Sequence, residues 1–549
     1  MGIYLPLILL ILVAYANNEI LAQNVEEAAI VVNATMPVAF TDDSFVCATI
    51  DWWPSDKCNY NNCPWGSSSV LNLDLVNTNL AKAVLAFNSL RIRIGGSLQD
   101  QVLYGIGDVN ASCQPFTKMA GRLFGFSKGC LSMDRWDKLN QFFKETRARI
   151  TFGLNALRGR HAIKGGSWVG NWNSTNAYDF IKYTISKGYQ IDSWEYGNEL
   201  SGKGIGARVG AEQYGKDVIK LKAILDELYD NNHNSQLKKP LLAAPGGFFD
   251  KEWYTKLLQV SGPNVVNLLT HHMYNLGAGV DKNITNKILD PNHLSRASTM
   301  FANLKQTIET SGPWSSAWVG ESGGAYNNGA HNVSDTFVNS FWYLDQLGMS
   351  STYGTKVYCR QTLIGANYGL LDIKTYIPNP DYYSALLWHR LMGKEVLSVN
   401  AIASPYLRSY AHCTKGRTGI TLLLINLSHQ TDFIVNVRNI ISLNMRNNYG
   451  DDDGASFTHR IKKSFSWVGS KASDVPSLRE EYHLTSKDGS LHSKTMLLNG
   501  QPLELTNIGD IPSLNHLLFS VNSPISIPSL SIKFIVFPNF DAPICKKQV

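Results

Sequence analysis

The sequence predicts an α/β fold, a (β/α)8 TIM barrel followed by a C-terminal β-sandwich. Short apolar runs alternate with amphipathic helical stretches over most of the chain, as in a parallel barrel. From about Val396 the pattern changes to short β-prone runs separated by Asn-Asn, Asp-Gly and Pro, which is typical of a sandwich. A chain of 549 residues is too long for one ordinary domain, and a barrel plus a smaller β domain accounts for it.

Eight apolar runs are assigned as barrel strands, because each is short and is followed by small or polar residues. They cover residues 45–51, 90–97, 148–155, 191–200, 241–246, 265–272, 317–326 and 356–361. Between them lie segments such as 211–229 and 334–347, in which apolar residues recur at helical spacing. Eight strands are the number that closes such a barrel.

The fourth and seventh of these runs present a glutamate near their ends. The fourth ends in Asn198-Glu199, and in the seventh Glu321 is followed by Ser-Gly-Gly. Catalytic groups of barrel enzymes lie at the carboxyl ends of the strands, so both carboxylates are expected at one mouth. A strand-ending acid alone also serves as a helix cap or an ion-pair partner, but a pair roughly 5 Å apart can cleave a glycosidic bond. Glu195, of the same strand parity as Glu199, is expected to be a paired acid of the barrel interior.

The first 22 residues are predicted to be a signal peptide. The apolar segment from Tyr4 to Ala16 is shorter than a bilayer span, and small residues at Ala14, Ala16 and Ala22 offer cleavage sites. An uncleaved anchor is the alternative. We therefore expect a protein without a transmembrane span that is secreted, or delivered to a vacuole or lysosome, with peripheral membrane association left open.

A secreted route agrees with the glycosylation and cysteine patterns. Asn-x-Ser/Thr triplets that would accept glycan if exposed begin at Asn33, Asn110, Asn173, Asn283, Asn332 and Asn426. The eight cysteines form an even set, for which three pairs are reasonable: Cys58 with Cys63, Cys113 with Cys130, and Cys413 with Cys545. Cys47 and Cys359 lie in apolar strands and are expected to be buried thiols.

The net charge and the positions of the histidines limit the kinds of ligand that the protein is expected to bind. The formal net charge of +6 is compatible with an anionic sugar but equally with a plain basic surface, and no run of lysine or arginine suggests nucleic acid. The neighbours His271 and His272 invite a zinc hypothesis, but adjacent strand residues point to opposite sides and no third ligand set is evident. We expect no metal and no cofactor. The oligomeric state is not predicted.

Three ordered motifs resemble glycoside hydrolase family 79, which holds the heparanases and the plant β-glucuronidases called heparanase-like proteins. They are Trp194–Glu199, Trp318–Ser322 and Arg360–Tyr368. The resemblance implies a retaining mechanism with Glu199 as acid/base and Glu321 as nucleophile, and it also suggests the Cys413–Cys545 pair. It further implies that residues before the barrel join the β domain, and that a secreted plant protein of this kind would reach the cell wall, with wall association left open. The expected organisation is a signal peptide (1–22), an N-terminal strand of the β domain (23–40), the catalytic barrel (41–394) and the β-sandwich (395–549).

The resemblance also implies a set of substrate-binding residues. Asp51 and Ser97 match positions around the sugar hydroxyls, and Asn198 matches an amide that binds the 2-hydroxyl. Tyr274 matches a tyrosine that bonds the nucleophile region. The complete set is Asp51, Ser97, Asn198, His272, Tyr274, Gln361 and Tyr368. Gln361 and Tyr368 match positions around the glucuronate. There the Tyr368 hydroxyl and nearby backbone amides are expected to hold the carboxylate of the sugar.

The chain departs from the vertebrate heparanases at several points. Asn327-Asn328 replace a glycine pair, the loop from Gly365 to Tyr368 is one residue shorter, and Phe248-Phe249 stand where those enzymes carry a basic cluster. These departures argue against a sulfated substrate. The segment 103–130 is shorter than the linker excised from vertebrate proenzymes, so we expect a single-chain enzyme.

The expected function is that of a secreted, glycosylated, retaining β-glucuronidase. Its expected substrates are terminal glucuronates of cell-wall proteoglycan glycans, or aromatic glucuronides. Glu199 must then be protonated in the free enzyme to act as the acid. The alternatives are an endo-acting heparanase on sulfated polysaccharide and a catalytically silent carbohydrate-binding barrel.

Overall fold

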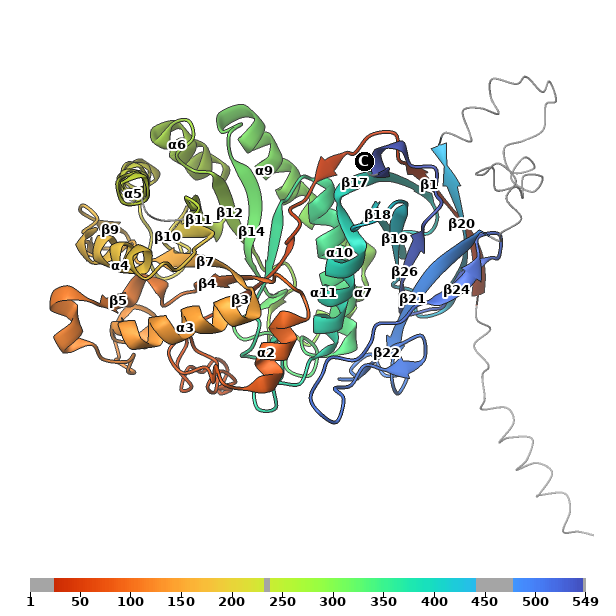
Figure 1. The fold of residues 1–549 in the computed structure, drawn as a ribbon, viewed down its shortest axis with the longest axis horizontal. Coiled ribbons are helices and arrows are strands. Elements are labelled where there is room, and N and C mark those ends of the chain that lie inside the picture. Colours follow the sequence, from red (N-terminus) through yellow and green to blue (C-terminus); the bar gives the residue numbers. More distant parts are fainter. Residues whose placement is uncertain (1–23, 232–236, 441–476, 547–549) are drawn as a thin grey trace, which may run out of the picture.

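The computed structural model describes residues 24–231, 237–440 and 477–546, which form a barrel and an adjoining β domain (Figure 1). The barrel is closed by eight parallel strands in the order β10-β11-β12-β14-β16-β3-β4-β7. They are β3 (Val46–Ile50), β4 (Arg91–Ile94), β7 (Arg149–Leu154), β10 (Ser193–Tyr196), β11 (Leu241–Phe248), β12 (Leu268–Met273), β14 (Ser316–Ser322) and β16 (Val357–Arg360). The fold class is confirmed, and every strand overlaps a run that the sequence assigned.

Helices surround this ring of strands (Figure 1). They are α2 (Thr78–Leu85), α3 (Met133–Thr146), α4 (Thr175–Ser186), α5 (Ala211–Asp230), α6 (Lys251–Ser261), α7 (Ile284–Leu289), α8 (Pro291–Ser295), α9 (Ala297–Ser311), α10 (Phe337–Thr352) and α11 (Pro380–Leu391). In α5, Tyr214, Val218, Leu221 and Leu225 are buried, so its apolar stripe faces the barrel. Nearly all of α10 is buried, because this helix lies between the barrel and the β domain.

Short elements decorate the loops of the barrel. They are η1 (Gln99–Gln101), η2 (Gly107–Ser112), η3 (Leu123–Gly125) and the paired strands β5 (Val102–Gly105) with β6 (Gly129–Ser132), β8 (His161–Ala162) with β9 (Trp168–Val169), and β13 (Gly277–Ala278) with β15 (Ala325–Tyr326). The last pair joins the loops that follow β12 and β14. These loops therefore hold each other beside the two strands that bring His272 and Glu321 to the mouth.

The second domain is a mixed sheet of 12 strands. Its members are β1 (Asn24–Asn33), β2 (Ala39–Phe40), β17 (Met392–Ile402), β18 (Leu407–Thr414), β19 (Ile420–Asn426), β20 (Thr431–Asn439), β21 (Leu478–Ser486), β22 (Met496–Leu498), β23 (Gln501–Pro502), β24 (Leu517–Ser520), β25 (Ile525–Ile527) and β26 (Ser531–Phe537). Strand β1 lies between β17 and β20, so both chain ends do build this domain. The strands are hydrogen-bonded through β17 into one sheet that folds around a core including Ile30, Phe433 and Ile535.

A buried polar contact joins the two domains. Asp345 of α10 accepts hydrogen bonds from Arg408 Nε at 2.7 Å and from the Tyr410 hydroxyl at 2.6 Å, both of which come from β18. Ser351 of α10 also lies 3.1 Å from His412 Nε2. Because a buried charge is stable only with partners, these contacts hold the β domain against α10 in one orientation.

Four disulfides are present among the described residues, and no cysteine there is free. The pairs Cys58–Cys63, Cys113–Cys130 and Cys413–Cys545 are those judged reasonable from the sequence. The expectation that Cys47 and Cys359 are thiols is wrong, since they form a disulfide across 312 residues. They face each other on β3 and β16, which become neighbours only because the barrel closes between its first and last strands.

The glycosylation triplets differ in accessibility. Asn173, Asn283 and Asn332 are exposed, and Asn33 is half-buried. The side chain of Asn110 lies outside the described part of the chain. Asn426 is 0% exposed, and its Nδ2 donates to three backbone carbonyls, so the prediction for this position fails: a glycan has no room at a nitrogen enclosed by β-domain backbone.

Candidate active site

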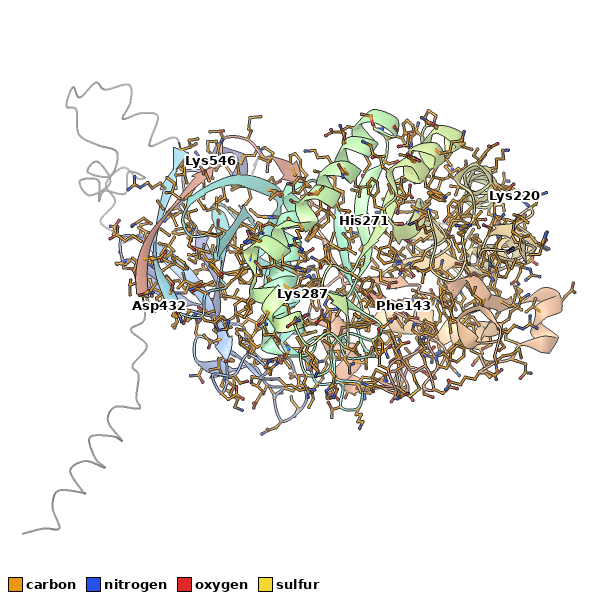
Figure 2. The ribbon with its side chains drawn as sticks, turned by 180° about the vertical axis from the view of Figure 1, so that it is seen from behind. Phe143, Lys220, His271, Lys287, Asp432 and Lys546 are labelled. Atoms are coloured by element: carbon orange, nitrogen blue, oxygen red, sulfur yellow. A yellow bond between two sulfur atoms is a disulfide. The ribbon has the colours of Figure 1, made fainter. Side chains whose placement is uncertain are left out.

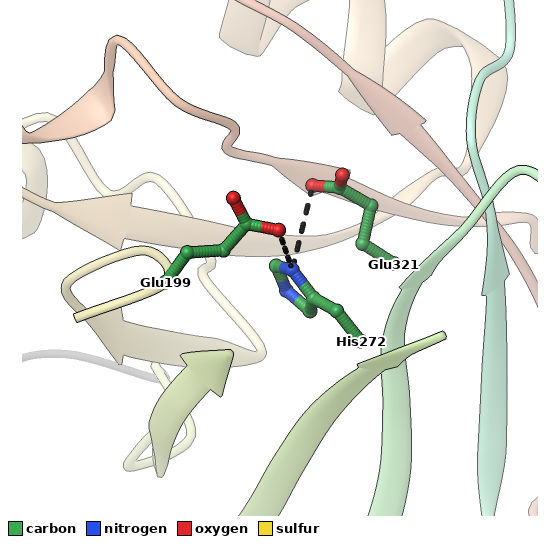
Figure 3. Close-up of side chains that lie close together, drawn as sticks. All are labelled: Glu199, His272 and Glu321. Carbon is green, nitrogen blue, oxygen red and sulfur yellow. Dashed lines mark hydrogen bonds and ion pairs between the residues drawn. The ribbon is translucent and has the colours of Figure 1, made fainter. Parts of the chain in front are cut away.

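The two glutamates and His272 meet at the carboxyl-terminal end of the barrel (Figure 3). Glu199 follows β10, His272 belongs to β12 and Glu321 to β14. One carboxylate oxygen of each glutamate and a ring nitrogen of His272 lie within 4.8 Å of one another. All three side chains are buried. The sequence-based expectation that Glu199 and Glu321 share one mouth therefore agrees with the geometry.

The backbone around Glu199 is held in an unusual conformation. Glu199 has φ +55°, in the left-handed region that costs energy for any residue other than glycine. Its N–H donates to the Gly246 carbonyl at 2.7 Å, and its own carbonyl accepts from Ile205 N–H at 3.0 Å. These two hydrogen bonds fix the turn that directs the carboxyl group into the mouth.

Glu321 is oriented by donors on both carboxylate oxygens. Arg93 Nη1 donates to Oε2 at 2.9 Å, and the Tyr274 hydroxyl donates to Oε1 at 2.6 Å. The same guanidinium donates through Nε to Glu195 Oε2 at 2.6 Å and through Nη2 to Asn198 Oδ1 at 2.8 Å. Arg93 thus ties β4, β10 and β14 together, and Glu195 is the paired interior acid that was expected.

Glu199 and His272 have protonation states suited to proton transfer. Burial raises the pKa of Glu199 to about 7, although Arg93 opposes this rise. Burial lowers the pKa of His272 to about 4, so the imidazole is neutral near pH 7. His272 Nδ1 lies 3.0 Å from Glu199 Oε1, and this neutral ring can share the proton of the Glu199 carboxyl group.

The raised pKa of Glu199 predicts an alkaline limit to catalysis. A general acid must be protonated, and the protonated fraction of Glu199 falls as pH rises through about 7. We expect kcat/KM to fall above that pH, about tenfold per pH unit well above the pKa. In Glu199→Gln the residual activity should lose this limb, whereas Glu212→Gln, an exposed control on α5, should keep it. A wild-type profile that stays flat through the alkaline range would contradict this assignment.

Asp51 and Gln361 form a second polar group beside the pair. Gln361 Nε2 donates to Asp51 Oδ2 at 3.0 Å, and Trp52 N–H donates to Oδ1 at 2.6 Å. Burial, and then the nearby charge of Glu321, raises the pKa of Asp51 to about 7. Gly96 has φ +118°, and a Cβ there would collide with the Asp51 carboxyl group, so only glycine fits.

Tyr368 and Ser97 are the other two residues that were expected to bind the substrate. Tyr368 is buried with its ring centroid 6.2 Å from that of Trp65, and burial followed by Asp51 and Glu321 raises the pKa of its hydroxyl. Ser97 is half-buried after Gly96 and has no hydrogen bond to either catalytic candidate. The adjacent histidines do point apart: His271, labelled in Figure 2, packs on Phe301 of α9 with ring centroids 5.9 Å apart.

Within the described ranges, Glu199, His272 and Glu321 are the one group of three His, Cys, Asp or Glu side chains that lie close enough together to hold a metal ion. The guanidinium of Arg93 lies 2.9 Å from Glu321, and its positive charge would repel a cation there. The chemistry of this donor set therefore favours acid–base and nucleophilic roles over metal binding.

Sequence reasoning missed Arg93 and Asp100. Asp100 Oδ1 accepts from Ala156 N–H at 2.7 Å and Oδ2 accepts from Asn198 N–H at 2.9 Å, so it fixes the residue before Glu199. For Arg93 a signal existed, because Arg91 and Arg93 alternate in an otherwise apolar strand and therefore face the barrel interior. Asp100 lies in a loop without any such pattern.

Replacing Asp100 by asparagine should slow catalysis. The amide has one oxygen for two backbone N–H donors, so its NH2 group would face a donor and leave one contact unmade. We expect kcat to fall roughly tenfold to a hundredfold, the effect of one lost charge-assisted hydrogen bond. Asp488→Asn makes the same carboxylate-to-amide change at an exposed position of the β domain, where the amide oxygen can still accept from Ser490 N–H, and it should leave kcat unchanged. An unaltered kcat in Asp100→Asn would show that this contact does not position Glu199.

Comparison with known proteins gives consistent matches. The family model for glycosyl hydrolase family 79, N-terminal domain, matches residues 27–348. Heparanase-like protein 1 of Arabidopsis thaliana is 59% identical over 525 residues, covering 96% of each chain. Baicalin-beta-D-glucuronidase of Scutellaria baicalensis is 41% identical over 527 residues, covering 93% of each. Among solved structures, a 4-O-α-L-rhamnosyl-β-D-glucuronidase from Fusarium oxysporum has a TM-score of 0.60 at 15% identity, covering 92% of this chain and 100% of that chain, a likeness in fold alone.

Proposed function

This chain belongs to glycosyl hydrolase family 79 and is a glycoside hydrolase, and from that premise we propose that it is a secreted, retaining β-glucuronidase. Its substrates are terminal β-linked glucuronates of cell-wall proteoglycan glycans, or aromatic glucuronides. The observation that supports this best is the pair Glu199 and Glu321, whose nearest carboxylate oxygens lie within 4.8 Å at the barrel mouth. The name of the Scutellaria relative, baicalin-beta-D-glucuronidase, supports glucuronate as the sugar and an aromatic glucuronide as the kind of substrate.

The spacing favours double displacement. Retaining enzymes hold their carboxyl groups about 5–5.5 Å apart, whereas inverting enzymes leave room for a water at roughly 6.5–9.5 Å. Glu321, held by Arg93 and Tyr274, attacks the anomeric carbon. Glu199 protonates the leaving oxygen and then, as base, activates the water that hydrolyses the glucosyluronate ester.

The loop after β16 supports a uronic acid over a neutral sugar. Tyr368 lies in it, next to Asp51 and Glu321. The backbone N–H groups of Ala366 and Tyr368 find no acceptor in the part of the chain that the structure describes. A phenol and two backbone amides are the donors that a carboxylate needs when it leaves water.

The test is hydrolysis of an aryl β-D-glucuronide beside the matching β-D-glucoside. We expect release from the glucuronide, with the β anomer of glucuronic acid formed first in ¹H NMR spectra. An α anomer formed first would exclude retention. Turnover of the glucoside at equal rate would exclude carboxylate recognition. Binding without any turnover, unchanged in Glu321→Gln, would favour the carbohydrate-binding alternative.

Export is part of the proposal. Four disulfides are typical of a protein that folds in an oxidising compartment. The exposed triplets at Asn173, Asn283 and Asn332 could accept glycan along the same secretory route. No helix in the described ranges is long and apolar enough to cross a membrane. The predicted signal peptide lies outside those ranges. Expression in plant cells should place the protein in the extracellular fluid, with a mass that falls after enzymatic deglycosylation, whereas retention in the cytosol would contradict export.

A further inference from the structure

A short hairpin lies in the loop after β3, at the end of the barrel where the two glutamates meet. The N–H of Asn59 donates to the Asn62 carbonyl and the N–H of Asn62 donates to the Asn59 carbonyl, both at 2.9 Å. The two residues between them have φ of +52° and +60°, as in the tight turns that suit hairpins. The Cys58–Cys63 disulfide closes this unit, and residues 58–63 are called the disulfide hairpin below.

The disulfide hairpin holds the loop after β14 through Asn328. This side chain is 3% exposed, and its Oδ1 accepts from Asn59 Nδ2 at 3.1 Å and from Trp65 Nε1 at 2.9 Å. Its Nδ2 donates to the Asn62 carbonyl at 3.4 Å. Because a buried amide needs partners for both its oxygen and its nitrogen, the position of Asn328 depends on the hairpin and on Trp65.

Asn328 in turn holds the loop after β16, which carries Tyr368. The Asn328 carbonyl accepts from Asn367 N–H at 2.9 Å, and the Gly329 carbonyl accepts from Asn367 Nδ2 at 3.3 Å. Gly329 packs so closely on the Tyr368 ring that a Cβ there would lie 2.6 Å from it. Trp65 meets the same ring edge-on, with centroids 6.2 Å apart. A continuous chain of contacts therefore runs from the hairpin to Tyr368.

The two catalytic glutamates are held by other elements. Arg93 of β4 and Tyr274 after β12 donate to Glu321. The N–H of Glu199 donates to the carbonyl of Gly246 in β11. None of these groups belongs to the hairpin or to the loops that it holds. Loosening the hairpin should therefore disturb the loop after β16 and spare the bond-breaking step.

The hairpin disulfide is accessible to a reductant. Cys63 is exposed, whereas the other seven cysteines are buried or half-buried. A thiolate of a dithiol can attack Cys63 Sγ, which breaks the S–S bond and releases Cys58 as a thiolate that takes a proton. The second thiol of the reductant then displaces Cys63, so the dithiol ends as a disulfide and two electrons pass to the protein.

We propose that the disulfide hairpin is a positioning element for the loop that carries Tyr368, and that its reduction weakens glucuronide binding without slowing the chemical step. The inference rests on the proposed function, in which Tyr368 and neighbouring backbone amides bind the sugar carboxylate. When the disulfide opens, Asn59 and Asn62 lose the covalent link that keeps them in register. Asn328 then loses the partners that hold its carbonyl against Asn367.

The kinetic test removes the covalent link without a reductant. In Cys58→Ser/Cys63→Ser we expect KM for an aryl β-D-glucuronide to rise roughly tenfold, the effect of losing a hydrogen bond or two, with kcat unchanged. Wild-type protein treated with dithiothreitol should show the same KM, and the variant should not respond to the reductant. Cys413→Ser/Cys545→Ser opens a disulfide of the β domain instead and should keep the wild-type KM.

Two kinetic outcomes would overturn the proposal. The first is a wild-type KM in Cys58→Ser/Cys63→Ser, or a loss confined to kcat, because the hairpin would then not support binding. The second is an equal response of this variant and of the wild type to dithiothreitol, which would assign the effect to another disulfide.

Asn328→Gly tests the route from the hairpin to the sugar site. Glycine keeps the φ of +77° without strain and removes only the side chain. If the hairpin acts through Asn328, KM in the combined variant should equal that of Cys58→Ser/Cys63→Ser alone. Asn264→Gly makes the same change at an exposed residue with φ +63° and should leave KM unchanged. Effects that multiply in the combined variant would exclude Asn328 as the link.

Hydrogen–deuterium exchange gives a result that does not depend on turnover. After reduction, peptides covering 362–370 should exchange faster, because the Asn367 N–H is held by the Asn328 carbonyl, and peptides covering β10 should not change. Unchanged exchange at 362–370 would contradict the positioning role. If exchange rises but no glucuronide is hydrolysed, the proposed function fails while the positioning role stands. If glucuronides are hydrolysed and neither KM nor exchange changes, only the hairpin inference fails.

Discussion

Replacing Glu321 by alanine is expected to lower kcat for an aryl β-glucuronide by about 10⁴-fold or more, the size of loss seen when a covalent nucleophile is removed. The truncated side chain leaves space for a small anion, and added azide should restore turnover. Azide would attack C1 from the face that Glu321 occupies, while Glu199 still protonates the leaving group. The product should therefore be the α-glucuronyl azide.

Glu199→Ala is the matched variant. An activated aryl glucuronide should still form the ester with Glu321, because a good leaving group needs little protonation. Azide would then replace the water of the second step and give the β-glucuronyl azide. NMR spectra of the two products thus assign each carboxylate separately. An α azide from Glu199→Ala would reverse the roles, and full activity in both variants would remove the two glutamates from the mechanism.

Replacing Arg93 is expected to reduce both stability and activity. Glu195 is 0% exposed and its described ion pair is with Arg93, so Arg93→Ala leaves a buried carboxylate uncompensated. Loss of one partner of a buried pair costs about 3–5 kcal/mol in the free energy of unfolding. The variant also removes the donor that orients Glu321 and Asn198. Chemical denaturation and kcat measure the two effects.

Two further variants separate these effects. In Arg93→Ala/Glu195→Gln the unpaired Glu195 charge is gone, so part of the lost stability should return, whereas kcat should remain low because Glu321 still lacks its donor. Arg93→Lys keeps the charge, but a single ammonium group cannot reproduce the planar arrangement that bonds three acceptors. Recovery of kcat in the double variant would show that Arg93 acts only on stability.

Much of the site was predictable because the carboxyl ends of parallel strands lie at the same end of a barrel. Once the fourth and seventh runs are assigned as barrel strands, Glu199 and Glu321 must face one mouth, and the geometry agrees. The sugar-side residues Asp51, Gln361 and Tyr368 were placed by family resemblance, and they lie together beside Glu321. Their roles in binding stay predictions.

Other features depended on contacts far apart in the chain. Asn426 satisfies a glycosylation triplet, yet β-domain backbone encloses its amide. Asp100 becomes a support of the acid only because its loop meets the end of β10. The cavity beside His272 and Tyr274 likewise arises where the ends of β11 and β12 meet α9.

The sequence by itself determined the strand and helix pattern and the mouth at which the two glutamates lie, because side-chain periodicity and strand direction are local properties. Only the tertiary structure decided which side chains touch and how they are charged. Closure of the barrel makes β3 and β16 neighbours, so Cys47 and Cys359 pair instead of remaining thiols. Burial at the closed mouth raises the pKa of Glu199 to about 7 and lowers that of His272 to about 4, since removal from water disfavours the charged form of each.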